Sequence, residues 1–166
     1  MHLSNNSSLG GIMNWKIVFV GGAVAYVAMF IVGIGTGYFI HSPDAGVLAE
    51  TYKATASFWR PELNQNPPDM MALMPMWIAS GLIGAFIVAG IYSVVRSSLT
   101  GAAWQRGLKF GVVVALFNLV NVLGFWGVFN LPGNVWQWWF VEGTILNLIG
   151  GIVLGVVAQK LAPAGN

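Results

Sequence analysis

The chain has 166 residues, of which 57% are hydrophobic and only 7% are charged, and its mean hydropathy is +0.74. A soluble domain has about a quarter charged residues, and a domain this small cannot bury so much apolar surface in water. The composition therefore excludes a soluble globular protein and predicts an integral membrane protein. A net charge of +2 is too small to indicate a nucleic-acid partner. Since the chain has no cysteine, disulfides, thiol catalysis and iron–sulfur ligation by this chain are also excluded.

The first long apolar segment, at about residues 15–40, is predicted to be a membrane span. After Lys16 it has 24 uncharged residues, which as a helix reach ~36 Å and cross a ~30 Å hydrocarbon core with some tilt. A signal peptide has a shorter apolar region of ~7–15 residues that ends at a small-residue cleavage site. The segment shows neither feature, so we expect a retained helix. Residues 1–14 are polar and predict a flexible tail, in which Met13 is an alternative start.

A polar connection follows at 41–69, and a short amphipathic helix is predicted within it. Ser42-Pro43-Asp44 is typical of a helix start, with a capping hydroxyl and a proline at the first position. Arg60-Pro61 ends the predicted helix, and 66–69 is expected to be an extended loop. The helix would lie on the membrane surface or cap the bundle. Its apolar face consists of Val47, Leu48, Thr51, Tyr52, Thr55, Phe58 and Trp59.

Three further spans are predicted at about 70–95, 110–129 and 135–159, which gives one transmembrane domain over 15–160 and a short tail at 161–166. Small residues recur every fourth position on the last two of them, in Gly107-x-x-x-Gly111-x-x-x-Ala115 and in Gly151-x-x-x-Gly155. Such patterns let helix backbones approach closely. They predict tight packing without indicating which helices pair.

The distribution of basic residues predicts the orientation of the chain. The 96–109 loop has three basic residues and no acid, whereas the 41–69 connection has two basic residues and four acids. The positive-inside rule then places both termini and the 96–109 loop in the cytoplasm. We therefore expect an all-α integral membrane protein with four transmembrane helices, N-in and C-in, and an external amphipathic helix between the first two spans.

Three asparagines are predicted to meet near the centre of the bilayer. Counting the rise per residue from the middle of each span puts Asn118, Asn121 and Asn147 at one depth. Asn118 and Asn121 are three residues apart and share a helix face. An amide in hydrocarbon needs a partner, so we expect hydrogen bonds between the third and fourth spans. These bonds would either hold the helices together or form part of a substrate site.

Glu142 is the acidic residue within the predicted spans. It lies about 7 Å outward of Asn147 by helical rise, and Thr36 and Ser80 are expected near its depth. A carboxylate in a membrane is a candidate proton or cation site. Alternatively, it reaches the water at the interface, or it complements the dipole at the start of the helix. The sequence places no basic residue at its depth, so its partner is expected to be a hydroxyl, a water or another subunit.

The remaining polar and aromatic residues carry weaker signals. Five tryptophans are predicted to be interface anchors. His41 is expected to be a surface residue, and a methionine cluster at 70–76 is expected to be packing rather than a copper site. No metal site and no cofactor are predicted, and no hydrolase, zinc-protease, P-loop or dinucleotide motif occurs. The anchors are Trp15, Trp59, Trp136, Trp138 and Trp139.

Three stretches of the sequence resemble small four-span proteins of bacterial inner membranes, families without an assigned activity. They are MNWKIVFVGG near the start, AGIYSVVRSSLTGAAWQRGLKFG between the second and third spans, and WWFVEGTILNLIGGIVLGVVAQ at the end. The resemblance covers most of the chain from Met13. It implies an inner-membrane location and four spans, but no reaction.

The sequence favours a non-catalytic structural or accessory subunit that packs against other membrane subunits or against itself. The scarcity of ionisable groups in the spans and the abundance of glycine and aromatic residues support this prediction. One alternative is a small oligomeric transporter or channel that uses Glu142 as its coupling site. Another is a binder of an apolar ligand such as a lipid, a quinone or a carotenoid pigment between the tryptophan-rich helices.

Overall fold

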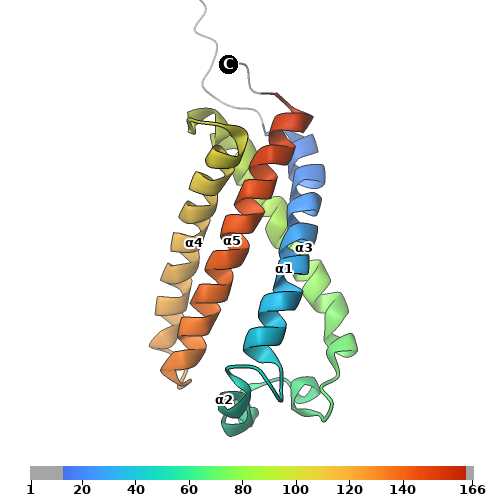
Figure 1. Cartoon of the computed structure of the whole chain (residues 1–166), viewed down its shortest axis with the longest axis vertical. Coiled ribbons are helices and arrows are strands. Elements are labelled where there is room, and N and C mark those ends of the chain that lie inside the picture. Colours follow the sequence, from blue (N-terminus) through green and yellow to red (C-terminus); the bar gives the residue numbers. More distant parts are fainter. Residues whose placement is uncertain (1–12, 164–166) are drawn as a thin grey trace, which may run out of the picture.

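Four long helices form the computed structural model, which describes residues 13–163 (Figure 1). They are α1 (Gly22–His41), which follows a π-helical turn η1 (Ile17–Gly21), α3 (Met70–Val95), α4 (Ala103–Trp126) and α5 (Gly133–Leu161). Each is long and apolar enough to cross a membrane, which confirms the predicted all-helical, four-span class. Most of the predicted tail, residues 1–12, lies outside the described residues.

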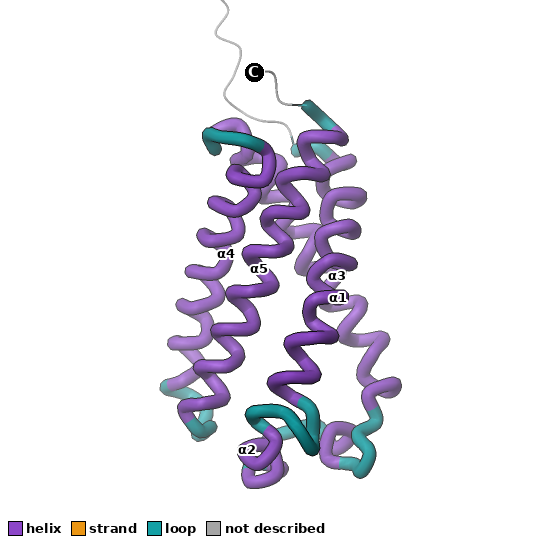
Figure 2. Tube along the Cα trace, viewed as in Figure 1, coloured by secondary structure: helices purple, strands orange, loops and turns teal. Residues whose placement is uncertain are grey.

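The two ends of the helix bundle carry different parts of the chain. The described N- and C-terminal residues and the α3–α4 loop lie at one end, which we call the terminal end (Figure 2). Residues 42–69 and the α4–α5 loop lie at the other, the connection end. Four of the five acids of the chain lie in residues 42–69, and the fifth, Glu142, lies on the part of α5 nearest this end. With the two Lys/Arg of 42–69, the formal charge of the connection end is −3, and the other five Lys/Arg give the terminal end +5.

Helices α4 and α5 are held together by their glycines. Gly107 faces the backbone of Gly151, and Gly155 packs against Gly107 from the next turn of α5. A Cβ atom on Gly111 would lie 2.6 Å from the carbonyl oxygen of Asn147, closer than van der Waals contact allows. The two small-residue patterns of the sequence therefore pair with each other, and close backbone approach is the basis of this contact.

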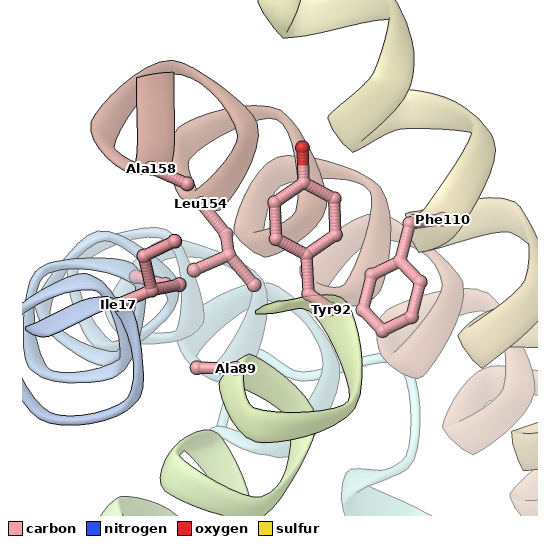
Figure 3. Close-up of a cluster of buried hydrophobic side chains, with 7 residues drawn as sticks. Ile17, Ala89, Tyr92, Phe110, Leu154 and Ala158 are labelled. Atoms are coloured by element: carbon pink, nitrogen blue, oxygen red, sulfur yellow. The ribbon is translucent and has the colours of Figure 1, made fainter. Parts of the chain in front are cut away.

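Helix α1 packs against the α4–α5 pair, and α3 packs against α1. Helix α1 and the turn η1 before it lie against α5, and Gly21 of η1 faces Leu154. Helix α3 contacts α1 in the half nearest the terminal end, where the ring of Tyr26 covers Gly81, and the two helices then diverge toward the connection end (Figure 1). Figure 3 shows the core that joins all four helices near the terminal end. Its buried residues are Ile17, Ala25, Ala89, Tyr92, Phe110, Leu154 and Ala158.

The third membrane helix begins earlier than the predicted 110. Helix α4 starts at Ala103, and the Gln105 side chain accepts a hydrogen bond from the backbone N–H of Ala102 at 2.8 Å, which stabilises the start of the helix. Two of the three basic residues that suggested a loop, Arg106 and Lys109, belong to this first part of the helix. The Arg106 guanidinium donates to the side-chain oxygen of Gln159 on α5, so a charge near the terminal end is compatible with a helix there.

The predicted connection helix from Ser42 is also wrong in extent. The helix α2 covers only Ala49–Ala54, followed by the 3-10 turns η2 (Ala56–Phe58) and η3 (Pro61–Asn64). Residues 42–48 instead fold back on α1, and the N–H groups of Val47 and Leu48 donate to the carbonyls of Phe39 and Ile40 at 3.0 and 3.1 Å. These bonds satisfy carbonyls that the end of α1 leaves free, and this conformation excludes a helix over the same residues.

Candidate functional site

The folded-back segment places α2 directly over the ends of α1 and α5. Leu48 is fully buried and packs with Ile40 and Val135. This contact turns the predicted apolar face of the connection, with Tyr52 and Trp59, toward the helices. The segment therefore caps the bundle, one of the two placements expected from the sequence.

Glu142 lies beneath this cap and is bound by two side chains of α1. One carboxylate oxygen accepts a hydrogen bond from the Thr36 hydroxyl at 2.8 Å, and the other lies 2.8 Å from Nε2 of His41. The Glu142 side chain is 17% exposed and the His41 side chain 32%. The expectation that no basic residue reaches Glu142, and that His41 is a surface residue, was wrong. His41 lies five positions beyond Thr36, and the long His and Glu side chains span that distance.

The other side of His41 continues the chain of hydrogen bonds. Nδ1 of His41 lies 2.7 Å from the Tyr52 hydroxyl, which also lies 3.2 Å from Nε1 of Trp139. An indole N–H is a donor only, so the Tyr52 oxygen accepts from Trp139 and donates its own proton to His41. A neutral imidazole then donates from Nε2 to the Glu142 carboxylate. We call Glu142, His41, Tyr52 and Trp139 the polar relay.

Tyr52 remains a neutral donor in this arrangement. Burial raises the pKa of its phenol above the ordinary value of 10.0, because an apolar environment disfavours the phenolate. The hydrogen bond from Trp139 opposes this shift, and the negative charge of Glu142 adds to it. The Tyr52 hydroxyl therefore keeps the proton that it donates to His41 at neutral pH.

An aromatic pocket of about 330 Å³ adjoins the relay. Trp139 belongs to both, since its N–H donates to Tyr52 while its ring lines the pocket. The rings of Trp59 and Trp136 stand nearly at right angles to it, with centroids 6.0 and 5.6 Å away. The complete lining is Phe58, Trp59, Phe125, Phe129, Leu131, Trp136 and Trp139.

The structure does not bring the three predicted asparagines together. Asn147 lies opposite Gly111, whereas Asn118 lies beside Gly143, about a turn nearer the connection end, and Asn121 is exposed. No hydrogen bond joins their side chains among the described residues. The predicted depths were wrong because α4 begins seven residues before the expected start of the span, which moves its centre toward the terminal end.

Ser80 does not lie near Glu142, and the predicted anchor tryptophans differ in how exposed they are. Ser80 is exposed and donates to the carbonyl of Trp77 on its own helix, away from Glu142. Trp15 is 61% exposed, whereas Trp136 is 2% exposed and belongs to the interior. Trp138 is half-buried and packs edge-on against Phe39.

A second cavity, of about 210 Å³, lies between α3 and the other three long helices. Its walls are mostly glycine and small apolar residues, and Asn147 is the polar residue that lines it. Gly84 of α3 is exposed, and a Cβ atom added there would meet no atom within 4 Å. We call this cavity, with Gly81 and Gly84 on one side and Gly111 and Gly150 on the other, the seam.

Comparison with known proteins adds no further assignment. No protein-family model, no curated protein and no solved structure matches the chain. The resemblance to small inner-membrane proteins therefore remains a prediction from the sequence, and the geometry of the site must support any function.

Proposed function

We propose that the protein is a non-catalytic accessory subunit of a membrane assembly, oriented with its terminal end in the cytoplasm of a bacterial cell. The seam carries this proposal, because it is a gap between α3 and the α4–α5 pair at the depth where helices pack. An apolar cavity of ~150 Å³ can hold a benzene molecule. The seam, at about 210 Å³, has room for an apolar side chain from a helix of a partner subunit.

The small residues of the chain support the same role. Gly107, Gly111, Gly151 and Gly155 are covered within the chain, but Gly84 lies in open space on α3. Small residues are enriched where membrane helices approach one another. A partner helix that packs along α3 would approach its backbone closely at Gly84, as α4 and α5 approach each other at their glycines.

The transporter alternative has less support from the geometry. Glu142 and His41 form a pair at the connection end, while the basic residues lie at the terminal end. Along the spans between these two levels, the sequence has no Asp, Glu, His, Lys or Arg. A proton or cation that reached Glu142 would find no further charged group to carry it across the membrane.

The test is to fill the seam. Gly84→Leu places a side chain where the partner is proposed to insert, and its Cβ atom would meet no atom of this chain within 4 Å. The matched control is Gly124→Leu on α4, which also has no atom within 4 Å. In a mild detergent, wild type and Gly124→Leu should elute as a complex larger than the 17.8 kDa chain, and Gly84→Leu should not.

Two results would contradict the proposal. A wild-type chain that runs alone, without a partner or a second copy, would exclude a subunit role. A Gly84→Leu chain that keeps its partner would show that the seam is not the contact. If native mass spectrometry finds a retained lipid or pigment in place of a protein, the seam is a ligand site, which is the second function that its volume favours.

A further inference from the structure

The aromatic pocket at the connection end has a chemistry that the accessory role does not explain. Six of its seven lining residues are aromatic, and they come from the connection, the end of α4, the α4–α5 loop and the start of α5. Trp136 is almost completely buried, whereas Phe125, Phe129 and Phe58 are 46–53% exposed. The pocket thus has a fixed tryptophan wall and a phenylalanine mouth.

The indole N–H groups of the pocket are all used by the protein. Trp59 donates to the hydroxyl of Thr55 at 2.9 Å, Trp136 to the carbonyl of Leu131 at 3.3 Å, and Trp139 to Tyr52 at 3.2 Å. None is left for a ligand. The walls therefore present the faces and edges of rings, which recognise apolar groups and cations but provide no hydrogen bonds.

The charges around the pocket favour a cation over a neutral ligand. The connection end has a formal charge of −3, and Glu142 follows Trp139 by one turn of α5. The two basic side chains of this end are paired with acids, Lys53 with Glu50 at 2.8 Å and Arg60 with Glu62 at 3.5 Å. No charged residue lines the pocket, so its rings are available to a cation from outside.

We infer that the aromatic pocket binds a quaternary ammonium group. Such a group has a positive charge, no N–H donor and an apolar surface of methyl or methylene groups, so it needs only what these rings offer. Aromatic cages recognise quaternary ammonium ligands by cation–π attraction within about 6 Å of the ring centroids. A volume of about 330 Å³ is at the small end of ligand pockets, which fits a headgroup-sized cation.

The test compares choline with its uncharged carbon isostere, dimethylbutanol, which has nearly the same shape. The full chain is purified in a sugar detergent, and binding is followed by tryptophan fluorescence and by calorimetry. Choline should bind at least about tenfold more tightly than dimethylbutanol, since a desolvated cation–π contact contributes that much. Equal affinities, or no binding of either compound, would overturn the inference.

A variant of the mouth separates the charge effect from a loss of structure. Phe129→Leu keeps an apolar side chain but removes a ring, so it should weaken choline binding by about two- to fivefold and leave dimethylbutanol unaffected. Phe117→Leu is the control, because Phe117 is 67% exposed on α4 and does not line the pocket. Equal losses in the two variants, or loss of both compounds in Phe129→Leu, would contradict a cation–π site.

The same chemistry occurs in a free quaternary ammonium compound and in a choline lipid headgroup. Repeating the titration in nanodiscs of phosphatidylcholine and of phosphatidylglycerol distinguishes the two sources. If the choline lipid alone weakens apparent choline binding, the pocket holds a headgroup. If choline binds equally in both discs, the site takes the free cation.

Discussion

The contact between His41 and Glu142 makes a quantitative prediction about stability. His41→Phe keeps the ring that stacks on Tyr52 with a centroid distance of 5.7 Å, but leaves the carboxylate with Thr36 alone. Glu142→Leu keeps the volume, but leaves the N–H of His41 without its acceptor. A buried polar group that loses its partner costs about 1–3 kcal/mol, so each single substitution should destabilise the protein by about 2 kcal/mol.

The double substitution should cost much less than the sum of the two singles. Replacing both partners of this hydrogen bond leaves neither of the two unpaired, although the hydroxyls of Tyr52 and Thr36 still lose their acceptors on these two residues. We expect a coupling energy of about 1–2 kcal/mol, well above the ~0.5 kcal/mol deviation found for independent sites. In the Thr36→Val variant, loss of the hydroxyl donor should cost about 1 kcal/mol.

The assay is thermal unfolding of the purified chain in one detergent. For a chain of this length, about 1 kcal/mol corresponds to a shift of ~2–4 °C in Tm. Each single variant should therefore unfold about 4–8 °C below wild type, and the double variant about 4–12 °C below, instead of the about 8–16 °C that additive effects would give. Strictly additive shifts would show that His41 and Glu142 do not interact, and the relay as described would be refuted.

Three further predictions concern the packing, the phenol and the end of α5. Gly111→Ala should destabilise the protein by about 1–3 kcal/mol in thermal unfolding, because its methyl group would lie 2.6 Å from a backbone oxygen of α5. The Tyr52 phenol should ionise above pH 10.0, as the ultraviolet difference titration of wild type against Tyr52→Phe would show. Arg96→Met should increase hydrogen exchange in the last turn of α5, since Arg96 donates to the carbonyls of Ala158 and Ala162 at 3.2 and 2.7 Å.

Each of these three predictions has a control or an outcome that would contradict it. Gly124→Ala has open space around it and should not destabilise; an equal loss at both glycines would exclude close packing as the cause. Because folding raises the pKa of Tyr52, its contribution to stability is complete below about pH 10 and is lost as the pH rises through the folded value; a phenol that ionises below pH 10 would refute its burial. Unchanged exchange in Arg96→Met would show that the guanidinium does not cap α5.

Hydropathy and length predicted the spans well, because they depend on the composition of each segment alone. Helix α3 covers residues 70–95 as expected, where a polar loop and a basic loop set clear limits. The start of α4 was harder to predict from the sequence, because Arg106 and Lys109 lie within the helix and also at the polar end of the bundle. Charged residues indicate where the chain meets water, but the helix extends beyond that boundary.

The contacts between helices needed the structure, because they depend on register. The sequence shows Gly107, Gly111, Gly151 and Gly155 but not that they face one another. The position of Asn118 beside Gly143, away from Asn147, follows from that register. The small-residue spacing was the available signal, and aligning the two patterns in antiparallel order would have predicted the correct pairs.

His41 shows why a site can be missed when each residue is judged by its own surroundings. At the end of a span, a lone histidine is most often a surface residue. Here residues 42–48 return to cap α1, which brings Tyr52 to one nitrogen of the ring while α5 brings Glu142 to the other. The signal in the sequence was the apolar face of the connection, since a face that includes Tyr52 and Trp59 is expected to pack against another part of the protein.

The shared position of Trp139 gives Glu142 a role that requires no transport. The Trp139 ring is a wall of the aromatic pocket, and its N–H donates to Tyr52. Tyr52 in turn donates to His41, which donates to Glu142. A ligand that displaced this ring would break the bond to Tyr52 and disturb the pair on α1 and α5. The relay therefore fixes the pocket to the two helices beneath it. On the proposed functions, the carboxylate that first suggests a coupling site acts as a positioning residue; the connection end binds a cation, and the apolar middle of the protein packs against a partner.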